Sequence, residues 1–267
     1  MLRWSIPLFR VLGIPLRLHW SFLALLFYFA WKGWQGAVME GVTASGGAIP
    51  IAGWPGMGWS VALLLAFFTC VVLHELGHCL TARRFGIGTR RILLLPIGGM
   101  ADMEEIPRQP SREILMTLAG PAVNFVIAGA LWLALSIVGG HARTETAASL
   151  RDLAEILMVW NLVMGTFNLL PAFPMDGGRV FRALLATRLP YVRATFWAAS
   201  VGKVLAVVGA LVAWFYFHVG LTVVLFAFIF WAGEMEYRLV KHREAEEEHW
   251  RNWWARQAEP VPAEPPA

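Results

Sequence analysis

The amino-acid sequence predicts an all-α polytopic membrane protein with about six transmembrane helices and a short membrane-associated β-hairpin near residues 91–103. Hydrophobic residues make up 58% of the 267 residues and charged residues only 15%, whereas soluble domains carry about 25% charged residues. The apolar residues gather in long runs, and many of the 14 tryptophans stand where a run begins or ends, as expected at a membrane interface. This composition excludes a disordered chain and favours one embedded in a bilayer.

Six apolar runs approach the length that crosses a bilayer, about 20 residues. They are Leu18–Trp31, Trp59–Ala82, Ile114–Val138, Leu153–Leu170, Phe196–Phe217 and Val219–Trp231. We therefore expect three parts: a cytoplasmic N-terminal segment at 1–16, a six-helix membrane domain at 17–240, and a charged, Pro-rich cytoplasmic tail at 241–267. Because the tail lacks the apolar residues of a core, we expect it to be partly disordered.

Lysine and arginine are distributed unequally between the segments that join these runs. One set of alternate segments carries 18 of them and the other set carries 3, with Lys203 inside a run. The positive-inside rule then predicts that both termini and the opening of the active site are cytoplasmic, at the cell membrane if the chain is prokaryotic. Because the basic residues are spread over short loops rather than gathered in a patch, we expect no nucleic-acid partner. Cys70 and Cys79 lie in one helical run about 13 Å apart, too far for a disulfide.

The pattern His74-Glu75-Leu76-Gly77-His78 lies in the second run. Histidines at positions i and i+4 of a helix differ by only about 40° around its axis, so both imidazoles can bind one metal ion. Glu75 projects to one side of them, where it suits a metal-bound water, as in zinc hydrolases. The alternative is a polar contact between helices. Polar and charged groups in an apolar span are costly, however, and favour a function.

A catalytic zinc site with two histidines needs a third protein ligand. Asp176 is the best candidate, because it follows the fourth run in a segment broken by Pro171 and Pro174 that can return the carboxylate into the membrane. An Asp-Gly pair also marks an ordinary turn. On spacing alone, Asp102 and Glu113 are rival ligands.

Residues Arg91–Met103 are too few to span a bilayer and centre on Pro96 and the pair Gly98-Gly99. They predict a hairpin that dips into the membrane beside the site and offers a strand edge to an extended peptide. Such an edge would satisfy the backbone of an unwound substrate. A plain amphipathic cytoplasmic loop is the alternative.

Polar residues also interrupt the later runs. Asn124, Asn161 and Asn168 lie in the third and fourth runs, where each suits either support of the site or packing between helices. For Lys203 in the fifth run, snorkelling, pairing with an acid and lining a gate stay open.

Three motifs together resemble the site-2 protease family of intramembrane zinc metalloproteases. They are His74 to His78, the run Ala119-Gly120-Pro121 with Asn124, and the segment from Asn168 to Asp176-Gly177. The resemblance implies that His74, His78 and Asp176 bind one zinc ion and that Glu75 is general base and acid. It also implies that Asn124, Asn168, Gly98 and Gly99 support the site or the substrate. The chain is similar to the compact six-helix branch, which lacks PDZ and nucleotide-sensing domains.

The leading hypothesis is therefore a zinc-dependent intramembrane endopeptidase. It would hydrolyse a peptide bond within or near a transmembrane segment of a membrane protein, with regulated intramembrane proteolysis as the implied setting. The alternative is a metal-transporting or metal-sensing membrane protein that uses the same His/Asp cluster. A transporter needs polar residues at successive depths, whereas the candidates here cluster at one level. The oligomeric state is not written in the sequence.

Overall fold

The computed structural model describes residues 4–36, 52–138, 145–217 and 220–258. Residues 1–3, 37–51, 139–144 and 218–219 and the last nine residues of the tail lie outside the described residues. The chain divides into two compact units, Met1–Leu170 and Pro171–Ala267. Each unit is described by itself.

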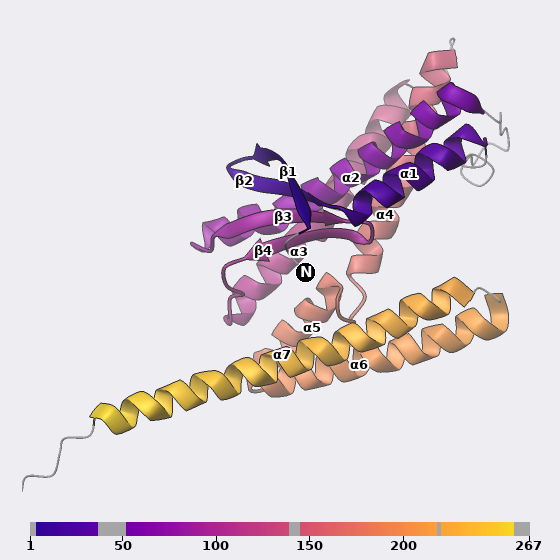
Figure 1. Ribbon diagram of the computed structural model, residues 1–267. Coiled ribbons are helices and arrows are strands. Elements are labelled where there is room, and N and C mark those ends of the chain that lie inside the picture. Colours follow the sequence, from indigo (N-terminus) through magenta and orange to yellow (C-terminus); the bar gives the residue numbers. More distant parts are fainter. Residues whose placement is uncertain (1–3, 37–51, 139–144, 218–219, 259–267) are drawn as a thin grey trace, which may run out of the picture. The chain divides into compact units, whose positions relative to one another are not determined.

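A four-stranded sheet in the first unit contains the predicted hairpin. Strands β3 (Thr89–Leu95) and β4 (Gly98–Met103) pair antiparallel, and β3 also pairs parallel with β2 (Ile14–His19). Strand β1 (Ser5–Val11) completes the order β1-β2-β3-β4 (Figure 1). The first two strands were not predicted, and the expected boundary between residues 16 and 17 falls inside β2.

The first hairpin closes through a two-residue loop. Val11 pairs with Ile14, and the intervening Leu12 and Gly13 have φ of 52° and 87°. Two positive φ values are those of the turn whose twist matches a β-hairpin, and glycine adopts them without a steric penalty. The loop therefore holds β1 against β2 although Pro7 and Pro15 interrupt both strands.

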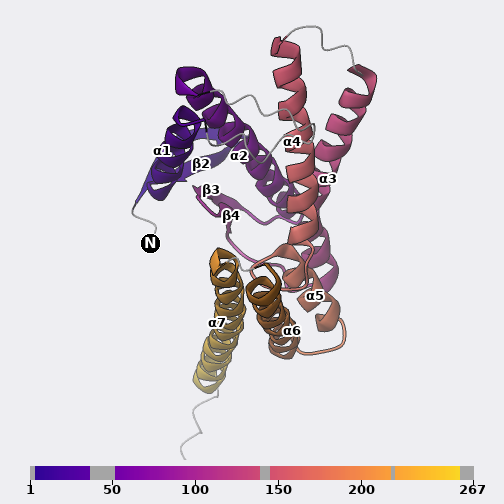
Figure 2. The same cartoon turned by 90° about the vertical axis from the view of Figure 1, so that its right-hand side faces the viewer.

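Four helices pack with this sheet in the first unit. They are α1 (Ser21–Trp34), α2 (Gly53–Arg84), α3 (Pro110–Val138) and α4 (Glu145–Asn168). In Figure 2, α1 lies beside α2, and α3 beside α4. One face of the sheet joins α2 in a core that includes Leu16, Phe68, Val71, Ile92 and Leu94. This core fixes the depth at which α2 meets the sheet.

The second unit consists of α5 (Asp176–Ala186), α6 (Tyr191–Val212), a π-helical turn (Ala213–Phe217) and α7 (Gly220–Ala258). Helices α6 and α7 run side by side (Figures 1 and 2). In the tail at 241–267, which the sequence analysis expects to be partly disordered, residues 241–258 continue α7. Ion pairs at i,i+4 such as His242–Glu246 favour helix in this charged segment.

Within the described part of the chain, three helices are long and apolar enough to cross a membrane by length and composition: Gly53–Arg84, Pro110–Ile137 and Tyr191–Phe215. Large hydrophobic side chains on these helices are exposed, including Leu65, Trp132 and Val204. Exposed apolar surface on long apolar helices indicates a membrane protein. The first predicted run differs from the structure, because its start belongs to β2 and its helix begins only at Ser21.

Candidate metal centre

Both histidines of the predicted motif lie on one side of α2 and are buried, with 5% of His74 and 7% of His78 exposed. Their Nε2 atoms are 3.1 Å apart. The i,i+4 spacing therefore brings the two rings together as the helical repeat requires. What the pair can bind depends on which nitrogen of each ring carries the proton.

The backbone of α3 sets the protonation of His78. Its Nδ1 lies 2.8 Å from the carbonyl oxygen of Met116. A carbonyl can only accept a hydrogen bond, so Nδ1 carries the proton and donates it. The Nε2 atom of neutral His78 then presents its lone pair toward His74.

A chain of two amides sets the protonation of His74 in the same way. Asn161 Nδ2 donates to the carbonyl oxygen of Leu157 at 2.7 Å, which orients the Asn161 amide. Asn161 Oδ1 accepts from Asn124 Nδ2 at 2.8 Å, and Asn124 Oδ1 is left to accept from Nδ1 of His74. Both asparagines are fully buried. The backbone of α4 thereby directs the lone pair of His74 Nε2 toward His78.

At 3.1 Å the two Nε2 atoms either share a proton in a hydrogen bond or, with both rings neutral, turn their lone pairs toward a cation. Zinc binds histidine nitrogen at about 2.0–2.1 Å in tetrahedral geometry, which places two such nitrogens roughly 3.4 Å apart. The space in front of the rings is bounded by Gly120 of α3. A Cβ atom there would lie 2.7 Å from His74 Nε2 and nearer still to His78 Nε2. The donors and the room beside them fit a metal ion.

Glu75 points toward the outer strand of the sheet. The backbone N–H of Ala101 in β4 donates to Glu75 Oε2 at 3.0 Å. Gly99 of the same strand comes so close that a Cβ atom would lie 2.6 Å from Glu75 Cγ. Its neighbour Gly98 has a φ of +139° at the hairpin turn. Gly99 thus permits the close approach of β4 to α2, and Gly98 permits the hairpin turn.

Asp176 belongs to the second unit, where it is the first residue of α5. The segment before it is held by Arg182, which is fully buried, pairs with Glu236 at 2.7 Å and lies over the Phe173 ring at 5.4 Å. Gly178 permits α5 to pass the backbone of Ala172 and Phe173, because a Cβ would lie 2.7 Å from it. The buried Arg182–Glu236 pair, close packing of the backbone and local backbone hydrogen bonds together hold this segment.

Among the described residues, His74, His78 and Asp176 make up a group of metal-ligating side chains able to hold one ion. The rival ligand Asp102 instead pairs with Arg91 at 3.0 Å. Glu113, the other rival, is fully buried in the first turn of α3. Asn168 is the partly buried last residue of α4.

Three residues of this region have roles that the sequence analysis missed. Gly120 leaves room beside the histidines, Asn161 orients Asn124, and Arg182 braces the segment before Asp176. Arg182 is one of the basic residues between the apolar runs, yet it is fully buried and forms an ion pair with Glu236. The available signals were an arginine within an amphipathic stretch and an amide deep in an apolar run. The open question on Lys203 is answered, because it pairs with Glu234 at 2.9 Å.

Comparison with known proteins assigns the family. The model of "Peptidase family M50" matches residues 62–150 and 136–209, more than half of the chain. The chain belongs to peptidase family M50. A solved structure, the site-2 protease from Methanocaldococcus jannaschii, is similar over 88% of this chain and 95% of its own, with 32% identity and a TM-score of 0.59. The resemblance to site-2 proteases is thus confirmed.

Curated relatives of this M50 chain carry names of the same kind. Zinc metalloprotease MJ0392 of Methanocaldococcus jannaschii is 34% identical over 244 residues, which are 90% of this chain and 62% of the relative. Stage IV sporulation protein FB of Bacillus subtilis is 32% identical over 132 residues, 49% of this chain and 43% of the relative. The chain therefore spans less than two thirds of these relatives.

Proposed function

We propose that this M50 chain is a zinc-dependent intramembrane endopeptidase. Its substrate would be a membrane protein, cut within or near a transmembrane segment. The observation that carries the proposal is the histidine pair, whose Nε2 atoms stand 3.1 Å apart with Gly120 keeping the space before them open. Zinc is the preferred ion because its relatives are named zinc metalloproteases.

Asp176 is proposed as the third ligand. Two buried imidazoles and one carboxylate are a donor set found in catalytic zinc sites, which keep a fourth position for water or substrate. The membership of the chain in family M50 and the His/His/Asp group support this assignment. We also propose that six helices span the bilayer, with both termini and the opening of the site on the cytoplasmic side, as the distribution of Lys and Arg predicts.

Bound zinc would acidify its water and polarise a peptide carbonyl. Glu75 supplies the proton transfer, because it lies one residue from His74 on α2 and its carboxylate is oriented by the Ala101 N–H. With Oε2 held by that hydrogen bond, Oε1 is the oxygen suited to take the proton of the attacking water and to deliver it to the leaving amine. His74 and His78 keep their lone pairs on Nε2 throughout, since their Nδ1 protons are donated to Asn124 and Met116.

The outer edge of β4 is proposed to receive the substrate as an added strand. Ala101 directs its N–H away from β3, so along this strand the backbone groups of Gly99, Ala101 and Met103 share the outward edge. A peptide paired there would pass beside Glu75 and would satisfy its unwound backbone inside the membrane. Gly98 suits this use because its φ of +139° forms the hairpin turn, and Gly99 because it lets β4 run close to α2.

The alternative, a metal transporter or sensor that uses the same cluster, receives no support from the family or from its relatives. It also gives Glu75 no task, whereas its carboxylate is oriented one residue from a ligand. Hydrolysis is the function that uses all the residues of the site.

The test compares purified wild type with Glu75→Gln and with Glu155→Gln, which changes a glutamate that pairs with Arg151 on α4. Zinc per chain and cleavage of a single-span substrate are measured with and without a chelator. We expect all three proteins to hold about one zinc per chain, and wild type and Glu155→Gln to cut. Glu75→Gln should lose at least about a hundredfold in rate.

Undiminished cleavage by Glu75→Gln would remove Glu75 from the chemistry. Wild type that holds no zinc would instead overturn the ligand set. Cleavage that survives the chelator in wild type would exclude a metalloprotease altogether.

A further inference from the structure

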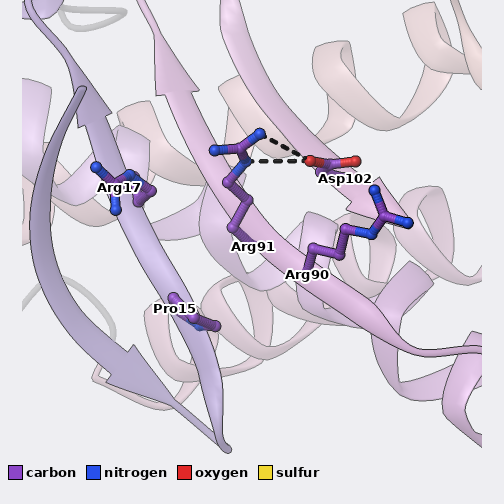
Figure 3. Close-up of a pocket in the computed structure, with 5 residues that line it drawn as sticks. All are labelled: Pro15, Arg17, Arg90, Arg91 and Asp102. Carbon is purple, nitrogen blue, oxygen red and sulfur yellow. Dashed lines mark hydrogen bonds and ion pairs between the residues drawn. The ribbon is translucent and has the colours of Figure 1, made fainter. Parts of the chain in front are cut away.

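The sheet carries a second polar site on its other side. Pro15 and Arg17 of β2, Arg90 and Arg91 of β3 and Asp102 of β4 line a cavity of about 330 Å³ (Figure 3). This volume is at the small end of ligand pockets, which hold roughly 300–1,000 Å³. Neither the histidines nor Glu75 line it, so the cavity is separate from the candidate metal centre.

Strand geometry explains why three arginines meet here. Arg17 stands opposite Leu93 in the register of β2 and β3, so Arg17 and Arg91 share a face of the sheet, away from buried Ile92. Strict alternation would turn Arg90 to the other face. The register of β3 against β4 shifts between Thr89 and Arg91, which makes Arg90 an extra residue and lets it line the same cavity.

The charges of the cavity do not balance. Of the three arginines, Arg91 is paired with an acid: its Nη2 and Nε atoms lie 3.0 and 3.1 Å from Oδ2 of Asp102 (Figure 3). Arg17 donates to the hydroxyl and the carbonyl oxygen of Ser5, both neutral acceptors, at 2.9 Å. Among the described residues, none forms an ion pair or hydrogen bond with Arg90, which is exposed. Three guanidinium groups therefore face one carboxylate.

We propose that this cavity binds the phosphate group of an anionic phospholipid. Guanidinium groups present paired N–H donors that match two oxygens of a phosphate, and several of them converge here. The charges of Arg17 and Arg90 are offset by no carboxylate of their own in the cavity and therefore favour an anion, beside which lies the Arg91–Asp102 pair. The proposal is independent of the proposed catalytic function.

Two features favour a lipid over a free phosphate. Strand β3 begins at Thr89, only five residues after the apolar helix α2 ends at Arg84, so the cavity lies near the level at which lipid phosphates occur. The neighbouring strand β1 exposes Leu8 and Phe9, and the loop after it exposes Leu12, with 45%, 62% and 60% of these residues accessible. Apolar side chains beside a basic cavity match the two parts of a lipid molecule.

The experiment uses the full-length chain reconstituted with phosphatidylcholine and phosphatidylglycerol, and native mass spectrometry to count the lipids that stay bound. The test variant is Arg90→Gln, and the control is Arg84→Gln, which removes an equal charge from an exposed arginine outside the cavity. We expect wild type to retain phosphatidylglycerol over phosphatidylcholine. Arg90→Gln should lose that preference about tenfold while Arg84→Gln keeps it.

A third variant changes binding in the opposite direction. Asp102→Asn releases Arg91 and removes the only acid of the cavity, so retention of phosphatidylglycerol should rise. A gain cannot result from misfolding. Equal losses in Arg90→Gln and Arg84→Gln would overturn the site, because they would reflect general charge attraction. Displacement of the lipid by inorganic phosphate at equal concentration would overturn the assignment to a lipid.

Discussion

Different interactions position the two histidines and the aspartate of the proposed zinc site. His74 and His78 are held by hydrogen bonds that end on the backbone carbonyls of Leu157 and Met116. The segment before Asp176 is held by packing, with Phe173 against buried Arg182 and glycine where the backbone turns closely. The first arrangement fixes a protonation state, and the second fixes a position.

This difference suits the chemistry of the ligands. An imidazole binds a metal only through a nitrogen that lacks a proton, so its other nitrogen needs a defined acceptor. A carboxylate is ionised at neutral pH and binds through either oxygen, so it needs placement more than orientation. Mutations in the histidine region should therefore change metal affinity, and mutations in the aspartate region should change stability.

The largest effect is expected from Gly120→Ala. The added methyl group would occupy the space before both Nε2 atoms, so zinc per chain should fall to near zero and cleavage should disappear with it. Gly129→Ala is the matched control, because Gly129 lies on the same helix and a Cβ there would have no atom within 4 Å. Metal analysis of both purified proteins checks this. Full zinc in Gly120→Ala would show that the ion lies elsewhere.

Next in size is Arg182→Ala in the second unit. It leaves Glu236 without its buried partner and removes the group over the Phe173 ring, so the free energy of unfolding should fall by about 3 kcal/mol. Arg238→Ala, which breaks an exposed i,i+4 pair with Glu234, should cost only about 0.3–0.5 kcal/mol. Thermal unfolding in micelles measures both. Equal losses would contradict the bracing role of Arg182.

Asn161→Ala should weaken metal binding. Without its amide, Asn124 is no longer oriented and His74 loses its defined acceptor, so zinc affinity should fall about 10–100-fold. Competition with a chromogenic chelator gives the affinity. Ser136→Ala is the control, because it removes an exposed hydrogen bond to Trp132 on α3. An unchanged affinity in Asn161→Ala would break the contrast between the two regions.

The smallest effect concerns Glu234, which follows the sixth predicted run. The hydrogen bond from Lys203, and then that from Arg238, lower the pKa of Glu234 below its ordinary 4.5. A lowered folded-state pKa adds stability above the unfolded value that is lost as pH falls through the folded value. At neutral pH the free energy of unfolding of wild type should therefore exceed that of Glu234→Gln by a few tenths of a kcal/mol. In denaturant titrations the unfolding midpoints of the two proteins should converge well below pH 4.5. A difference that persists in acid would refute the linkage.

The sequence predicted what depends on regular spacing. The i,i+4 histidines, the hairpin around Gly98-Gly99 and the apolar helices all follow from a helical or strand repeat. Strands β1 and β2 were missed because Pro7 and Pro15 weaken their pattern. In addition, β2 is held in the sheet by the distant strand β3, where Leu16 pairs with Ile92.

Contacts between distant residues could not be read from spacing. The sequence shows Asn161 only as an amide in an apolar run. Its role in orienting Asn124 depends on hydrogen bonds to Asn124 and Leu157 that only the structure reveals. Arg182 resembled the other basic residues until its burial against Glu236 was known. Residues 244–258 lacked an apolar stripe, yet their charges sit at helical spacing.

Because Gly120 has no side chain, the residue at this position of α3 indicates whether a metal ion can fit beside the two histidines. A related chain that kept His-Glu-x-x-His on α2 but carried any side chain at the matching position of α3 would have no room for an ion between its imidazoles. Such a chain would retain the His-Glu-x-x-His motif but would be expected to bind no metal ion and to be inactive. The residue at that single position is therefore expected to distinguish metal-binding proteins with this fold from those that bind no metal.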